Sequence, residues 1–196
     1  MAIDDVAAAL QRVRSVLERR PESGIHDDSA ATASWAGGTR VFASHPGGAR
    51  YATDMPAEFG GSGEHVTPGW FFRAGLASCT ATSIAFVAAG EGVQLDLMEV
   101  KVASRSDSRG LLGLADAGGS PVEPGPVSIG MQVRIAAAGV PAAELQRIAR
   151  EGFGRSPVPG ALKGARPIEF SVEVVTAPAS PPTAGSSDPP QAMPAP

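Results

Sequence analysis

Between Arg73 and Glu91 the chain has seventeen residues without a charge, and most of them are apolar. The run contains serines and threonines and falls short of the roughly 20 uniformly apolar residues that a membrane span needs. Thr67 suits a helix N-cap and Pro68 the first helical position, so we predict a long helix over 69–89. Because this helix is apolar nearly all round, we expect it to be buried in the core of a soluble protein.

Two stripes of the predicted helix differ in side-chain size. One stripe has only small residues, which would let another helix approach closely: Gly75, Ser78, Thr82, Ala85 and Ala89. The other carries larger side chains and places Cys79 in the middle of the helix, between Leu76 and Ser83.

Three later segments alternate apolar and polar residues strictly: 97–103, 127–135 and 168–174. This alternation is typical of antiparallel strands with one buried face. A helix is predicted over 141–152 and a helical turn over 157–163. We therefore expect an α+β fold with antiparallel sheets.

Upstream, residues 30–56 are expected to form short strands, with hairpin turns at Gly37-Gly38 and Gly47-Gly48. The glycine-rich loop from Pro56 to Pro68 lacks the lysine and the Ser or Thr of a phosphate-binding loop.

The two ends of the chain differ from this central domain, which we place at 21–176. Residues 1–20 are predicted to form an amphipathic helix over 3–19 that docks on the domain and stops at Pro21. Residues 177–196 hold seven prolines among alanines and serines, a composition that indicates a disordered tail.

The composition excludes several kinds of function. A net charge of −4 argues against binding nucleic acid through phosphate neutralisation. One cysteine excludes an internal disulfide and a cysteine-rich metal site, and the histidines His26, His45 and His65 lack metal-ligand spacing. We predict no metal and no cofactor, and the charged N-terminus without a signal sequence favours a cytoplasmic protein that binds no membrane.

Cys79 is the one side chain with obvious nucleophilic or redox chemistry, although free cysteines are often simply buried apolar residues. A cysteine becomes reactive when a cation or a helix N-terminus stabilises its thiolate. Cys79 lies eleven residues after Pro68, beyond the reach of the helix dipole. An Arg or His from another element would have to activate it.

Residues 67–113 resemble the OsmC/Ohr family, which has a proline-led long helix with a cysteine in an Ala-Leu-x-x-Cys context, a Gly-(Val/Ile)-x-Leu turn, a strand, and an Asp-x-Arg-Gly hairpin. The segment 53–64 (TDMPAEFGGSGE) is similar to the strand and Gly-Gly loop that precede the helix in that family. The segment 156–162 (SPVPGAL) follows in family order, so the resemblance covers about 30–176.

The resemblance implies long central helices wrapped by antiparallel sheets in an intertwined homodimer, with two active sites at the interface. The best-known members reduce organic hydroperoxides with two cysteines and an Arg–Glu pair that activates the first thiol. The first cysteine corresponds to Cys79. For the arginine, Arg40 is the first candidate and Arg50 the second.

This sequence departs from the family pattern at two positions. The second cysteine belongs near the start of 156–162, where this chain has Arg155, Ser156 and Pro157. The glutamate that commonly follows the helix-opening proline is replaced by Gly69.

Three hypotheses follow for the function. One is a one-cysteine peroxidase in which an external thiol reduces the Cys79 sulfenic acid. The second is a module without peroxidase activity that binds a hydrophobic small molecule at the dimer interface near Trp70, Phe71 and Phe72. The third is a different reaction that depends on Cys79.

Overall fold

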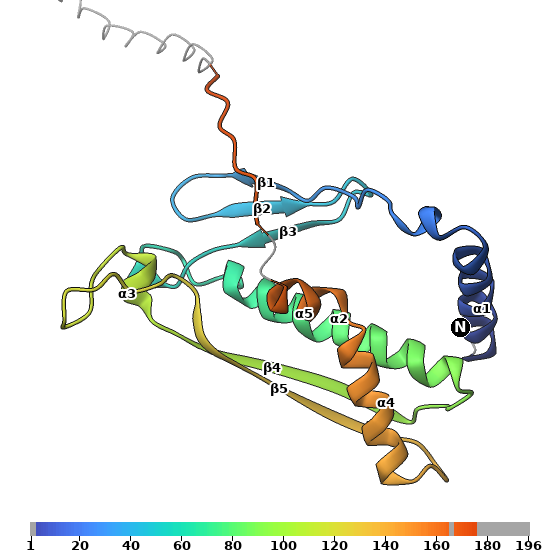
Figure 1. The fold of residues 1–196 in the computed structure, drawn as a ribbon. Coiled ribbons are helices and arrows are strands. Elements are labelled where there is room, and N and C mark those ends of the chain that lie inside the picture. The colour runs from blue at the N-terminus through green and yellow to red at the C-terminus, as the bar shows by residue number, and fades with distance from the viewer. Residues whose placement is uncertain (1–2, 165–166, 176–196) are drawn as a thin grey trace, which may run out of the picture. The chain divides into compact units, whose positions relative to one another are not determined.

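The computed structural model describes residues 3–164 and 167–175. The chain divides into two units, 1–166 and 167–196, and all the helices and strands named here belong to the first (Figure 1). In chain order they are α1 (Ile3–Arg19), β1 (Thr32–Trp35), β2 (Val41–Ser44), β3 (Arg50–Thr53), α2 (Pro68–Gly90), β4 (Leu97–Ser106), α3 (Ser108–Leu111), β5 (Pro126–Ala136), α4 (Ala142–Gly154) and α5 (Pro157–Lys163). Short 3-10 turns lie at Pro21–Gly24 and Ala57–Phe59.

The long helix α2 has the ends that the sequence predicts. Thr67 is the N-cap, and its Oγ1 accepts a hydrogen bond from the backbone N–H of Trp70 at 3.2 Å. Pro68 fills the first helical position, where its missing N–H costs no hydrogen bond. Beyond the other end, Gly92 has a φ of +70°, a conformation that stops a helix and favours glycine.

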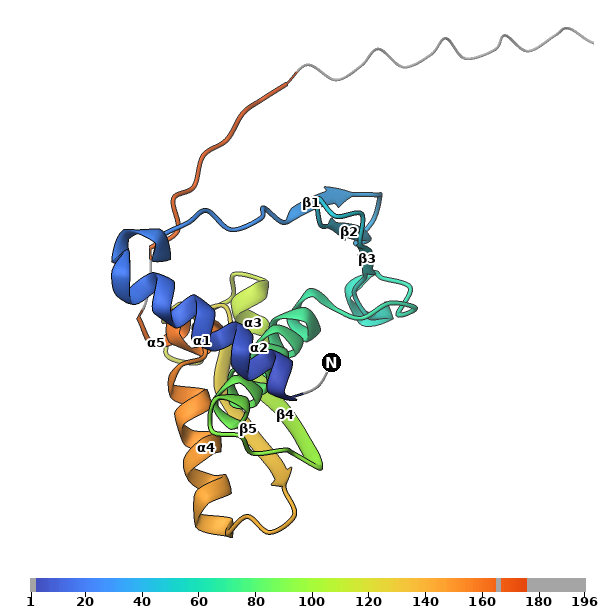
Figure 2. The same ribbon diagram turned by 90° about the vertical axis from the view of Figure 1, so that its right-hand side faces the viewer.

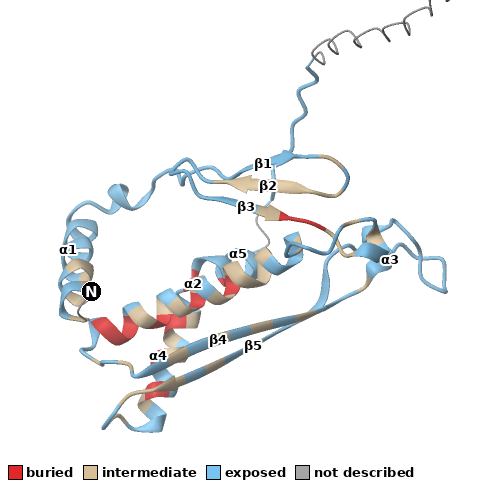
Figure 3. Ribbon diagram, turned by 180° about the vertical axis from the view of Figure 1, so that it is seen from behind, coloured by how far each residue is buried: buried red, intermediate tan, exposed pale blue. Residues whose placement is uncertain are grey.

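The core forms where α2 packs against α4 and against the β4–β5 pair. Its buried centre consists of Ile84, Val87, Ala88 and Ile148, and half-buried hydrophobic residues surround it: Val93, Leu95, Met98, Val100, Val133, Ile135 and Ala149. Figure 3 shows the buried residues gathered on α2 and α4. The predicted helix over 141–152 is confirmed as α4, and the predicted turn over 157–163 as α5.

Two antiparallel sheets accompany the helices. β1, β2 and β3 pair in sequence order through the two predicted glycine turns, with Trp35 opposite Val41 and Ser44 opposite Arg50. β4 and β5 form a long two-stranded ribbon in which Val100 faces Val133. A mixed helix-and-sheet fold with antiparallel sheets and a long central helix is therefore confirmed.

α4 approaches α2 most closely at Gly152. A Cβ added to Gly152 would fall 2.5 Å from the Cα of Ile84, much shorter than any van der Waals contact. Gly152 is buried, and no other residue fits at this distance. The glycine therefore sets the spacing of the two helices.

We expect Gly152→Ala to lower the free energy of unfolding by about 1–3 kcal/mol, because the added methyl group forces the helices apart. Gly154→Ala is the matched control: it lies in the same helix, and its Cβ would have nothing within 4 Å. Urea unfolding measures both variants. Equal stability of the two would contradict a tight contact at Gly152.

The prediction that α2 is buried nearly all round is wrong for the single chain. Trp70 is 46% and Phe86 47% exposed, and the small residues Ser78 and Thr82 are exposed as well. Among the described residues, α2 contacts α4, β4, α1 and α5, and the face that carries Ser78 and Thr82 stays exposed. The described residues contain one helix, α2, that is long and apolar enough to span a membrane, a test that the core helix of a soluble protein also passes.

The strand predicted over 168–174 is also absent from the described structure. Residues 167–175 form no strand, and the apolar side chains of the alternating pattern are 72% to 92% exposed: Ile168, Phe170, Val172 and Val174. Alternation shows that one face of a segment is suited to burial, but the segment needs a neighbouring strand to pair with. The predicted disordered tail, 177–196, lies outside the described residues.

The N-terminal helix α1 docks on the rest of the first unit, as predicted. It contacts α2, and Figures 1 and 2 place it beside the C-terminal half of that helix. None of its residues is buried, and Val13 is 55% exposed.

Candidate functional site

The sulfur of Cys79 lies half-buried on α2, facing the start of α5. Two groups hydrogen-bond to it: the Ser156 hydroxyl, with Oγ 3.2 Å from Sγ, and the backbone N–H of Val158, with N 3.4 Å from Sγ. Ser83, one turn further along α2, donates to the Cys79 carbonyl at 3.0 Å. The sulfur is thus an acceptor for two donors from a segment more than 70 residues away.

Ser156 joins α4 to α5 and is buried, with 2% of its surface exposed. Its Oγ also lies 3.4 Å from Oγ1 of Thr80, which is fully buried on α2. The family resemblance marked this position only as the place where a second cysteine is missing. The structure shows that the residue there contacts Cys79 directly.

The 3.2 Å distance between the Ser156 Oγ and the Cys79 Sγ leads to a prediction for the variant Ser156→Cys. A second sulfur at that position would lie within reach of Cys79, so treatment with diamide should form an intramolecular disulfide. Thiol titration under denaturing conditions should find no free thiol after oxidation and two after reduction with dithiothreitol. Two thiols that persist through oxidation of the native variant would contradict the geometry.

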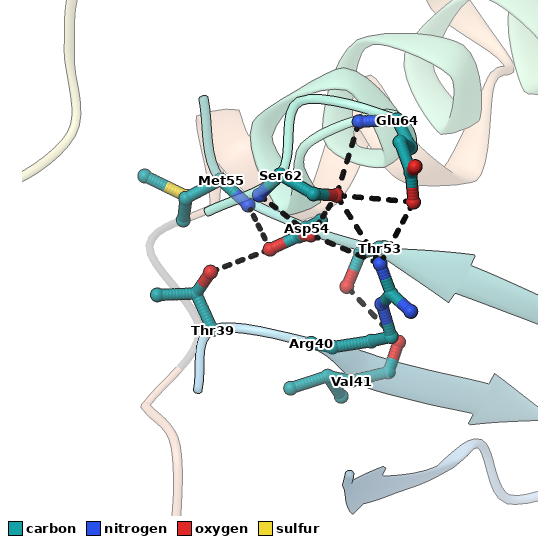
Figure 4. Close-up of polar contacts among 8 residues, drawn as sticks. All are labelled: Thr39, Arg40, Val41, Thr53, Asp54, Met55, Ser62 and Glu64. Atoms are coloured by element: carbon teal, nitrogen blue, oxygen red, sulfur yellow. Dashed lines mark hydrogen bonds and ion pairs between the residues drawn. The ribbon is translucent and has the colours of Figure 1, made fainter. Parts of the chain in front are cut away.

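Arg40, the predicted catalytic arginine, lies just before β2 in a polar cluster with Asp54, Ser62 and Glu64 (Figure 4). One terminal guanidinium nitrogen is 3.2 Å from the Ser62 hydroxyl, 3.1 Å from a carboxylate oxygen of Glu64 and 3.6 Å from a carboxylate oxygen of Asp54. Within the described chain, Arg40 makes these contacts and none with Cys79. The second candidate, Arg50, lies over the ring of Phe42, 3.8 Å from its centroid.

Asp54 is the centre of this cluster and is 3% exposed. Its carboxylate accepts hydrogen bonds from the Ser62 hydroxyl at 2.6 Å, the Thr39 hydroxyl at 2.5 Å and the backbone N–H groups of Ser62 and Met55 at 3.1 and 2.8 Å. These donors, the Ser62 hydroxyl first and the Thr39 hydroxyl second, hold the pKa of Asp54 well below its ordinary value.

The loop after β3 folds over Asp54 because Gly61 permits it. A Cβ on Gly61 would fall 1.7 Å from the carbonyl oxygen of Met55, so only glycine fits. A small cavity of about 180 Å³ lies here, lined by Gly37, Gly38, Thr39, Arg40, Asp54, Gly60, Gly61 and Ser62, with Ala36. The Gly37-Gly38 turn and the Gly60-Gly61 loop thus bring the carboxylate, the hydroxyls and the guanidinium together.

The lowered pKa of Asp54 predicts a pH dependence of stability. A depressed native pKa contributes stability that is complete above the ordinary value of about 3.9 and is lost as the pH falls below it. Asp54→Asn removes this contribution. The difference in free energy of unfolding between wild type and variant should therefore be smaller at about pH 3 than at about pH 6.

Urea unfolding midpoints at the two pH values test this prediction. Glu58→Gln, which removes an exposed carboxylate from the same loop, serves as the control and should follow the wild type. A gap between wild type and Asp54→Asn that stays constant across the two pH values would contradict the prediction.

Two of the three aromatic residues predicted to bind substrate lie together at the start of α2. The rings of Trp70 and Phe71 meet edge to face with centroids 5.6 Å apart, and Tyr51 of β3 contacts Phe71 in the same way at 5.9 Å. Tyr51 was not among the predicted residues. Phe72 is half-buried, and the structure records no ring contact for it among the described residues.

A larger cavity of about 800 Å³ lies elsewhere, between α1 and the C-terminal half of α2. Its walls combine apolar side chains with polar and charged ones, the apolar set being Ala7, Leu10, Val13, Leu17, Phe86, Val87 and Pro157. Trp70, Phe71 and Phe72 line neither of the two cavities. Whether they bind a small molecule stays a prediction.

Two of the histidines make contacts with residues close to them in the sequence. Nδ1 of His45 accepts a hydrogen bond from Gly47 in the second hairpin turn at 2.9 Å, and His26 lies 3.6 Å from Asp28 at the surface. Across residues 3–164 and 167–175, no group of three or more His, Cys, Asp or Glu side chains is arranged to hold a metal ion.

The sequence matches the family model described as OsmC-like protein over residues 61–171, more than half of the chain. The protein therefore belongs to the OsmC-like family. Among curated proteins, no sequence matches this chain at a significant level.

Solved structures share its fold. An OsmC-like protein from Mycoplasma pneumoniae is 15% identical, with a TM-score of 0.59 over 71% of this chain and 90% of that one. An organic hydroperoxide resistance protein OsmC from Legionella pneumophila is 20% identical, with a TM-score of 0.53 over 71% and 92% of the two chains. An OsmC-like protein from Vibrio cholerae is 12% identical, with a TM-score of 0.53 over 69% and 94%. At these identities the likeness establishes the fold alone.

Proposed function

We propose that this protein reduces organic hydroperoxides at Cys79, with an external thiol as the reductant. The observation that carries the proposal is the Cys79 sulfur on α2, half-buried, with two hydrogen-bond donors directed at it. Membership of the OsmC-like family supports it, as does the name of the Legionella relative, an organic hydroperoxide resistance protein. The protein has one cysteine, so no internal disulfide can form.

The reaction follows from these residues. The Cys79 thiolate attacks the terminal oxygen of the hydroperoxide, an S–O bond forms, and the O–O bond breaks. The alkoxide leaves with the electron pair of that bond and takes up a proton, which gives the alcohol and a sulfenic acid. One external thiol then forms a mixed disulfide and releases water. A second thiol releases Cys79 and leaves as an external disulfide.

We also propose that the active form is a homodimer in which Arg40 belongs to the site. Two surfaces of the single chain support this. The face of α2 that carries Ser78 and Thr82 is exposed, and the alternating apolar side chains of 168–174 lie open to solvent. Exposed apolar surface of this kind is typical of subunit interfaces.

The cluster around Asp54 supports the role of Arg40, because it fixes the guanidinium without the glutamate that Gly69 replaces. Arg40 would stabilise the negative charge that develops on the peroxide oxygens. The single free thiol also fits a cytoplasmic location, where cysteines stay reduced.

A second candidate function is the binding of a hydrophobic small molecule without peroxidase activity. The cavity of about 800 Å³ between α1 and α2 favours it, because its size is that of a ligand site and its walls pair apolar side chains with polar ones. This hypothesis predicts that Cys79 is inert toward hydroperoxides.

Peroxide consumption separates the two functions. With dithiothreitol as the reductant, wild type should consume cumene hydroperoxide faster than hydrogen peroxide, because the proposed substrate is an organic hydroperoxide. Cys79→Ser should consume neither, since the nucleophile is gone. Both proteins should have a mass in solution of twice the 19.8 kDa chain.

Turnover that survives in Cys79→Ser would rule out the thiol mechanism. Wild-type Cys79 that yields no sulfenic acid with either peroxide would instead favour the binding function, and a monomeric mass would rule out the proposed dimer.

A further inference from the structure

We infer that the Ser156 hydroxyl is a further catalytic residue, which activates Cys79 by donating a hydrogen bond to its sulfur. The inference rests on the proposed function in taking Cys79 as the nucleophile. It goes further by naming the group that activates the sulfur, for which the sequence indicated an arginine or a histidine.

The Ser156 hydroxyl donates its one proton to the Cys79 sulfur. Each hydroxyl has one proton, and the Ser156 Oγ contacts both the Cys79 sulfur at 3.2 Å and the Thr80 Oγ1 at 3.4 Å. When Ser156 donates to the sulfur, its oxygen is free to accept from Thr80. The two buried hydroxyls then form a chain that ends on the sulfur.

The backbone N–H of Val158 adds a second donor, which cannot turn away because it belongs to the main chain. A neutral thiol is a weak acceptor, whereas a thiolate accepts hydrogen bonds strongly. Two donors directed at one sulfur therefore stabilise the negative charge that the sulfur carries as a nucleophile. Burial strengthens the Ser156 bond, since 2% of that residue reaches solvent.

The position of the Ser156 hydroxyl also suits the product of peroxide reduction, a sulfenic acid on Cys79. When the sulfur becomes a sulfenic acid, the same hydroxyl remains beside it and cannot react to form a disulfide. Ser156 would thus support attack on the peroxide and leave the oxidised sulfur to an external thiol.

The test compares wild type, Ser156→Ala and Ser83→Ala in the full-length chain. Alkylation of Cys79 by iodoacetamide at neutral pH reports the reactivity of the sulfur without any peroxide. Ser156→Ala should slow alkylation about ten-fold, the effect of losing one hydrogen bond to a charged group. Ser83→Ala is the matched control, because its hydroxyl bonds the Cys79 carbonyl and not the sulfur. It should react at close to the wild-type rate.

Two results would overturn the inference: a Ser156→Ala rate equal to wild type, or an equal slowing in both variants, which would indicate a general loosening of α2. Consumption of cumene hydroperoxide by the same proteins separates this inference from the proposed function. If wild type consumes none but the alkylation contrast holds, the proposed function fails and the role of Ser156 stands. If wild type turns over and Ser156→Ala alkylates normally, the role of Ser156 fails and the proposed function stands.

Discussion

The close contact between α2 and α4 is the constraint on which the rest of the structure depends. It exists because residue 152 has no side chain, so the backbone of α4 can lie directly on Ile84. The contact completes the core, in which Ile148 and Ile84 are fully buried. The contact also positions the C-terminal end of α4. The chain just after that end carries the Ser156 hydroxyl and the Val158 N–H, which donate hydrogen bonds to the Cys79 sulfur. The α2–α4 contact therefore supports both the core and the hydrogen bonds to the Cys79 sulfur.

A buried carboxylate organises the polar cluster around Arg40. Asp54 joins three segments that are separate in sequence: the turn before β2, the end of β3 and the loop that contains Ser62. Each segment supplies a donor, and the carboxylate stays ionised because every one of them stabilises its charge. Arg40 takes its place at the edge of this cluster, where Glu64 also contacts it. The guanidinium is thus held by the carboxylates of Asp54 and Glu64, which the sequence did not indicate as its partners.

The sequence was most informative where a pattern repeats locally. The start of α2 was predicted from Thr67 and Pro68, and the β4–β5 pair from strict alternation, because these signals depend on neighbouring residues. The contact of Ser156 with Cys79 spans 77 positions, and no local pattern encodes it. Resemblance to the family marked the position without showing what a serine does there. The prediction for 168–174 failed for the opposite reason, since its pattern is strong but no described strand pairs with it.

The serine at position 156 has one more consequence, for how long an oxidised Cys79 would last. A protein with a thiol in that place can discharge an oxidised sulfur on its own within the same molecule. The Ser156 hydroxyl cannot reduce a Cys79 sulfenic acid. The lifetime of that sulfenic acid would therefore depend on the external thiols available to reduce it. Where those thiols are scarce, continued exposure to oxidant would carry the sulfur on to irreversible acids. The irreversibly oxidised fraction of Cys79 would then reflect how much thiol its compartment holds.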